Sequence, residues 1–151
     1  MPGYVQASLL KFQHPEPQHR QDAPHTWRRP IYGASVQYAD PADTSPPLSP
    51  QTINRIQQVV GTLLYYSIAV DPNMLVAVGA IATNQAKGTQ KTHEATVWLL
   101  NYAASHPHAT IRYRASGMVL HIHSDASYLS EPCSRSRAGG HFFLAAHPSI
   151  R

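Results

Sequence analysis

The residues best suited to chemistry lie in one stretch, and Asp125 is the first of them. The segment that begins at Met118 alternates apolar and polar residues as a β-strand does, which predicts that it delivers Asp125 to a strand end. Two small residues follow and leave room for a ligand. A carboxylate placed in this way could hold a hard cation such as Mg²⁺ through oxygen. The structural alternative is that Asp125 accepts hydrogen bonds from the turn that follows it.

Zinc is an alternative ligand for the same stretch. His121 and His123 are two residues apart, so on a strand both imidazoles lie on one face, and Asp125 and Cys133 are close in sequence. Structural zinc sites usually take paired Cys or His ligands from both sides of a longer loop. Because Cys133 is the single cysteine of the chain, the pattern is incomplete, and a small zinc-binding protein stays the less favoured hypothesis.

Arg135 and Arg137 lie in a predicted loop, Ser127 to Gly140, that leads into an apolar strand over His141 to Ala145. Guanidinium groups beside a glycine-rich backbone are well suited to phosphate, because the backbone allows a close approach. A solvated loop with no ligand would have the same composition. Nucleic-acid contact and simple solvation are therefore both open for these arginines.

The whole composition restricts the function only broadly. The chain has 151 residues, a net charge of +4 and a pI of about 9.4, which permits an anionic partner without the charge density of a dedicated DNA-binding domain. A single cysteine excludes an internal disulfide and favours a reducing, intracellular location, either cytoplasmic or nuclear. No apolar run is long enough to span a membrane, so we expect no membrane partner.

Three segments are expected to position the chemistry-bearing stretch. Residues 1–48 should form an irregular arm, because eight of the thirteen prolines lie between His14 and Pro50, with a short helix or a strand-to-helix entry over residues 3–12. Residues 49–107 should form three helices, opened by Ser49-Pro50, Asp71-Pro72 and Thr89. Residues 108–151 should form a short antiparallel sheet. The predicted fold class is therefore α+β.

The sheet is predicted to begin with a hairpin. Residues 110–115 alternate in strand fashion, and Ser116-Gly117 offers a two-residue turn before the strand that ends at Asp125. In the arm, residues 36–38 could add a short strand. The sheet would keep an open edge, which could pair with a second copy of the chain.

Several segments, taken in order, resemble the Pol polyprotein of copia-type LTR retrotransposons, where reverse transcriptase passes into ribonuclease H. Met1-Pro-Gly-Tyr-Val looks like the end of the polymerase palm as it enters the thumb. Gln57-Gln-Val-Val-Gly-Thr-Leu-Leu-Tyr-Tyr is similar to the family's "xxVGSLLY" helix, and His93-Glu-Ala-Thr-Val-Trp-Leu-Leu-Asn-Tyr to "HWKAxxRILRYL". His121 to Ala126 is similar to the "GYSDAD" strand, and Arg135-Ser-Arg-Ala-Gly-Gly-His-Phe-Phe-Leu to "RRSTSGYVFFL".

The resemblance implies a polyprotein fragment whose sheet is an incomplete ribonuclease H fold. Asp125 matches the first catalytic carboxylate of ribonuclease H, which uses two divalent ions, normally Mg²⁺, to hydrolyse the RNA strand of an RNA-DNA hybrid. Ser127, Arg135 and Arg137 are the residues expected to contact nucleic acid. No segment after Asp125 matches the remaining carboxylates, and no segment matches the polymerase aspartates. We therefore expect the isolated chain to bind nucleic acid without catalysing either reaction, and to hold Mg²⁺ only weakly. The alternative is a stand-alone module that binds nucleic acid or protein.

Overall fold

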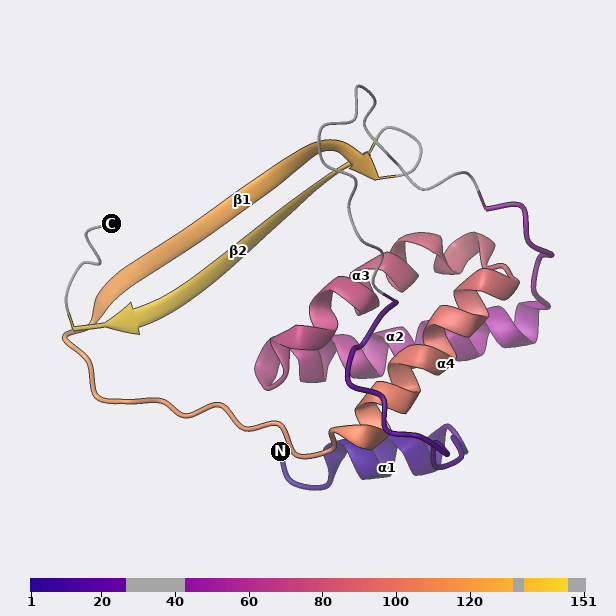
Figure 1. The fold of residues 1–151 in the computed structure, drawn as a ribbon, viewed down its shortest axis with the longest axis horizontal. Coiled ribbons are helices and arrows are strands. Elements are labelled where there is room, and N and C mark those ends of the chain that lie inside the picture. Colours follow the sequence, from indigo (N-terminus) through magenta and orange to yellow (C-terminus); the bar gives the residue numbers. More distant parts are fainter. Residues whose placement is uncertain (27–42, 132–134, 147–151) are drawn as a thin grey trace. The chain divides into compact units, whose positions relative to one another are not determined.

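The structure is a computed structural model that describes residues 1–26, 43–131 and 135–146, and its class is α+β. Four α-helices belong to a helical unit made of residues 1–26 and 43–111, and a two-stranded antiparallel sheet belongs to a second unit that begins at Arg112 (Figure 1). The strand expected at residues 36–38 and the candidate ligand Cys133 lie outside the described residues. No helix among those described is long and apolar enough to cross a membrane.

The long helix α2, Pro50–Ala69, begins where its sequence provides a cap and a proline. The Ser49 hydroxyl accepts a hydrogen bond from the Thr52 N–H at 3.3 Å, and Pro50 occupies the first helical position, where no N–H is needed. The helix ends at Ala69, with Val70 as its C-cap, and Asp71-Pro72 starts the next turn. Both ends agree with the sequence prediction.

The next two helices are also started by local side-chain chemistry. Asp71 accepts from the Asn73 N–H and opens the 3₁₀ turn η1, Pro72–Met74, which leads into α3, Leu75–Asn84. A second 3₁₀ turn, η2, spans Gln85–Lys87. Helix α4, Gln90–Ser105, begins with a capping box in which Thr89 and Thr92 each satisfy the other's backbone N–H.

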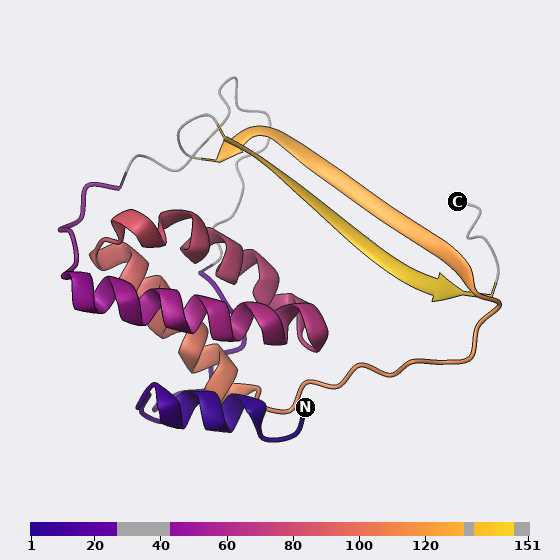
Figure 2. The ribbon, with the colours of Figure 1, turned by 180° about the vertical axis from the view of Figure 1, so that it is seen from behind.

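The core of the helical unit lies where α2, α3 and α4 pack against one another, with α1, Tyr4–Lys11, against α4 (Figures 1 and 2). Val5, Val78 and Leu99 are fully buried, one from each of α1, α3 and α4. Tyr66 and Tyr102 are buried as well, and burial raises the pKa of both phenols above the usual 10.0.

The described parts of the first 48 residues, 1–26 and 43–48, belong to the helical unit and do not form a separate arm. Helix α1 is part of the helical core. The segment at residues 13–26 is hydrogen-bonded to α4: the Gln21 N–H donates to Ser105 Oγ at 2.9 Å, and the Trp98 indole N–H donates to the Ala23 carbonyl at 2.9 Å. The structure therefore groups these described residues with the helices, whereas the sequence divided them from residues 49–107.

Residues 43–48 form a second attached segment, at the start of α4. Asp43 accepts hydrogen bonds from the Ser45 N–H and from the hydroxyls of Ser45 and Thr89. These bonds, the one from Thr89 first, lower the pKa of Asp43 from 3.8 to about 2. The Gln90 N–H donates to the Pro46 carbonyl, so the backbone also holds this segment against the helix start.

The sheet pairs β1, Val119–Glu131, with β2, Arg135–Ala145. The register runs from Val119 opposite Ala145 to Ser127 opposite Arg137, with an irregularity before Glu131 pairs with Arg135. The predicted strand at residues 110–115 is wrong, because residues 111–118 form no regular element. The acid-bearing strand pairs with the segment after it and not with the one before it.

The Ser116-Gly117 pair is not a hairpin turn but the entry to β1. Met118 takes a left-handed backbone with φ of 59°, and its N–H donates to Ser116 Oγ at 3.3 Å. A Cβ atom at Gly117 would lie 2.9 Å from the Ala146 carbonyl oxygen, so the close approach of the two sheet ends requires glycine there.

Candidate nucleic-acid interface

Asp125 lies within β1 and not at a strand end. Its backbone is opposite Gly139, and β1 continues past it because Ala126 and Ser127 pair with Ala138 and Arg137. The predicted turn after Asp125 is therefore wrong. The carboxylate is exposed, and its Oδ1 is 2.8 Å from the N–H of Ala126. The small residues Ala126 and Ser127 were predicted to form a turn, but they extend the pairing of β1 with β2.

The predicted loop from Ser127 to Gly140 is also mostly sheet. Arg135 and Arg137 are in β2, and Ser127 is directly opposite Arg137. The Ser127 hydroxyl donates to the Arg137 carbonyl at 3.4 Å. The pairing continues to Glu131 opposite Arg135, after an irregularity beyond Ser127, so the strands extend into the segment that the sequence assigned to a loop.

One face of the hairpin brings the predicted site residues together. Side chains that alternate along a strand, and those directly opposite across an antiparallel pair, lie on the same side of a sheet. With the observed register, Asp125, Ser127, Arg135 and Arg137 share a side with three histidines. We call this side the polar face; it consists of Val119, His121, His123, Asp125, Ser127, Arg135, Arg137, Gly139, His141 and Phe143.

Four rings form a group on the polar face. The Phe143 ring has its centroid 5.0 Å from that of His121 and 5.0 Å from that of His141, and both pairs are stacked. His123 lies 5.4 Å from Phe143 in a tilted arrangement. His121 is buried and Phe143 half-buried, whereas His123 and His141 are exposed. The sequence did not predict this group. Residues 135–140 were expected to lie in a loop, so the alternation that runs from Arg135 through His141 to Phe143 was not interpreted as one continuous strand.

The polar face does not form a metal site from the residues that the structure describes. No three His, Cys, Asp or Glu side chains among them converge on a point. Successive residues on the same face of one strand are about 6.6 Å apart. The His121 and His123 rings both pack against Phe143. Asp125 faces Gly139, which has no side-chain oxygen to add. The described residues of the polar face therefore offer no cluster of three metal ligands.

The opposite side of the hairpin is apolar and exposed. We call it the apolar face, and its large side chains are Leu120, Ile122, Phe142 and Leu144, with 58%, 57%, 64% and 48% of their surface exposed. Since the sheet has two strands, each strand has one edge whose backbone groups pair with no described strand. The hairpin is therefore polar on one side and hydrophobic on the other.

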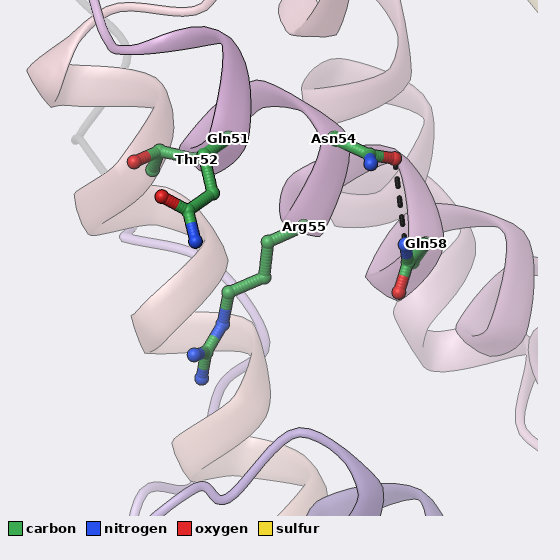
Figure 3. A pocket seen from close by; sticks show the side chains of 5 residues that line it. All are labelled: Gln51, Thr52, Asn54, Arg55 and Gln58. Carbon is green, nitrogen blue, oxygen red and sulfur yellow. Dashed lines mark hydrogen bonds between the residues drawn. The ribbon is translucent and has the colours of Figure 1, made fainter.

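A hollow on α2 is a weaker candidate site. It measures about 340 Å³ and is lined by Gln51, Thr52, Asn54, Arg55 and Gln58 (Figure 3). Every lining side chain is polar and comes from one helix. The Arg55 guanidinium donates to the Phe12 carbonyl, and Gln58 donates to Asn54 at 3.4 Å. Small-molecule sites are mostly apolar and enclosed, so this hollow has little of their character.

No protein-family model, curated protein or solved structure matches the chain. The functional argument therefore rests on the geometry of the polar face and on the sequence segments described above.

Proposed function

We propose that the chain contacts nucleic acid through the polar face of the hairpin. The observation that carries the proposal is the shared position of Ser127, Arg135 and Arg137 on that face. Arginine side chains bind phosphate oxygens through charge-assisted hydrogen bonds, and serine hydroxyls often add to such contacts. Residues 108–151 contain five arginines and two acids, so the segment that holds the face is basic.

We further propose that the chain is a fragment of a copia-type retrotransposon polyprotein that covers the thumb or connection of reverse transcriptase and the start of ribonuclease H. The support is the order of the sequence segments. The segment similar to "xxVGSLLY" lies in α2, the one similar to "HWKAxxRILRYL" lies in α4, and the Asp125 strand pairs with the strand that ends in Phe-Phe-Leu-Ala. This origin would place the chain inside the cell, in the cytoplasm or nucleus.

The proposed activity is binding without hydrolysis. Cleavage of an RNA-DNA hybrid by two metal ions requires several carboxylates around the ions. Among the residues that the structure describes, no three possible metal ligands come together on this face or elsewhere. A hybrid incubated with the purified chain and Mg²⁺ should stay intact; efficient cleavage that is lost in Asp125→Asn would refute the proposal.

Binding is tested by charge removal with a matched control. The double variant Arg135→Ala/Arg137→Ala removes two positive charges from the polar face, and Lys87→Ala/Lys91→Ala removes two exposed charges from the helical unit. Affinity for a fluorescent oligonucleotide should fall in the arginine variant and stay near wild type in the lysine variant. Each lost phosphate contact should also reduce the slope of log K against log salt by about 0.7 for a single strand. Equal losses in both variants would show that net charge alone drives binding.

The apolar face supports a second candidate function, which is self-association. A two-stranded sheet is marginal alone in water, and a third strand or an apolar partner stabilises it. Two copies related by a two-fold axis could pair identical edges or cover the apolar face, because such an interface uses the same residues twice. Light scattering should then report a dimer that dissociates in Phe142→Ser, whereas a monomer at high protein concentration would exclude this function.

A further inference from the structure

The ring group gives the polar face a second kind of surface beside its charges. His121, Phe143 and His141 form a stacked row, and the His123 ring lies against Phe143 in a tilted arrangement. Two of the four rings, His123 and His141, are exposed, and these two residues lie directly opposite each other in the register. An exposed, flat π surface at the end of a row that is already stacked can accept one more ring.

We infer that this surface is a stacking platform for the bases of single-stranded nucleic acid, an inference that rests on the proposed function. Bases of a single strand have free faces, and proteins without sequence preference bind such strands by stacking bases on aromatic rings next to a basic track. The polar face contains both parts. His141 is four residues from Arg137 on the same strand, about 13 Å away along a β-strand.

Charge and shape distinguish this occupant from others. A protein or lipid partner that bound through hydrophobic contact would use the apolar face, where the exposed Leu, Ile and Phe side chains lie. A metal ion is disfavoured because the imidazoles surround a phenyl ring and do not converge. Duplex DNA is the serious competitor, since a two-stranded ribbon can enter a major groove. In a duplex, however, the base faces are covered by their neighbours, and the rings would have nothing to stack on.

The expected consequence is binding that depends on bases as well as on phosphates. Arg135 and Arg137 would neutralise the backbone of the strand, while His123 and His141 would each take a base face. Removing an aromatic platform residue typically weakens single-strand binding by about tenfold for each stacked base. Removing the arginines should instead weaken all anionic ligands, whether or not they carry bases.

The probes are an oligo(dT) strand, an abasic strand of the same length, and a duplex. We expect the wild-type chain to bind oligo(dT) about tenfold tighter than the abasic strand, and also tighter than the duplex. His123→Ala/His141→Ala should lose this base-dependent difference, and His123→Phe/His141→Phe should keep it because a ring remains. The matched control His19→Ala/His25→Ala removes two exposed histidines outside the hairpin and should behave as wild type. A circular dichroism spectrum of each variant confirms that it is folded.

The outcomes separate this inference from the proposed function. Three results would refute the stacking platform. They are equal affinity for oligo(dT) and the abasic strand, a preference for the duplex, and unchanged oligo(dT) binding in His123→Ala/His141→Ala. If binding under any of these outcomes still falls in Arg135→Ala/Arg137→Ala, the proposed function stands without it. If none of the three probes binds, both are refuted.

Discussion

Replacing Leu99 with alanine should be among the most damaging single changes in the helical unit. Leu99 lies on α4 with none of its surface exposed, and α4 packs against each of the other three helices. Truncating a fully buried leucine removes its transfer free energy and leaves a cavity, which together cost about 2 to 5 kcal/mol. For a unit of this size, a loss of about 3 kcal/mol lowers the melting temperature by about 12 to 24 °C.

The matched control is Leu10→Ala, which makes the same chemical change on α1 at a side chain that is 79% exposed. Its effect should stay within about 0.5 kcal/mol. Thermal unfolding followed by circular dichroism at the helical minimum measures both variants. Equal shifts in melting temperature for Leu99→Ala and Leu10→Ala would refute the assigned core, because burial is the difference between the two sites.

Three further predictions concern local contacts. Thr89→Ala removes the N-cap of α4 and should lower the free energy of unfolding in urea by about 1 kcal/mol. The same change should raise the pKa of Asp43, followed by NMR titration, back toward 3.8. An unchanged Asp43 titration would contradict the contact between Thr89 and Asp43. Burial raises the pKa of Tyr66 in the folded state, so its contribution to stability is present below pH 10.0 and is lost as the pH rises above that value. The urea midpoint should therefore fall at alkaline pH, and it should fall less in Tyr66→Phe. Identical pH profiles for the two proteins would contradict the assignment of this loss to Tyr66. Asp125→Asn removes the negative charge near Arg137 and should tighten oligonucleotide binding a few-fold in EDTA; weaker binding would show that the carboxylate itself makes a favourable contact.

The helices could be predicted because their signals are local. Ser49-Pro50 and Thr89 fix helix starts through bonds to residues within one turn, and Asp71-Pro72 both ends α2 and opens η1. Apolar spacing also indicated most of the buried positions of α2 and α3, but Leu64 and Leu75, which were expected on the same sides, are exposed. The helix starts need no knowledge of the rest of the fold, and the structure confirms them.

The sheet was harder to predict because strand pairing is a choice between distant partners. Residues 110–115 alternate as convincingly as residues 135–145, and Ser116-Gly117 is a plausible turn. The observed pairing instead places Leu120 opposite Leu144 and Ile122 opposite Phe142, which gives apolar cross-strand pairs that the earlier segment cannot match. Local alternation does not reveal this preference, since it depends on both strands together.

The sequence named the residues of the candidate site but did not predict how they are arranged. Asp125, Ser127, Arg135 and Arg137 do share one face, as a site built from the stretch requires, but the predicted turn and loop around them are strands. The ring group around Phe143 could have been found by extending the alternation of His141 and Phe143 back to Arg135. The glycine pair at 139–140 concealed it, because glycine in sequence favours a loop and here lies opposite Ser124 and Asp125 inside the ladder.

Mapping the contact directly is the most decisive measurement for the polar face. Ultraviolet crosslinking of a bound oligonucleotide, followed by mass spectrometry of the digested protein, identifies the peptides that touch nucleic acid. Our account predicts crosslinks within residues 119–127 and 135–143, at the strands that form the polar face. Crosslinks confined to α2, α4 or the segment at residues 43–48 would contradict it.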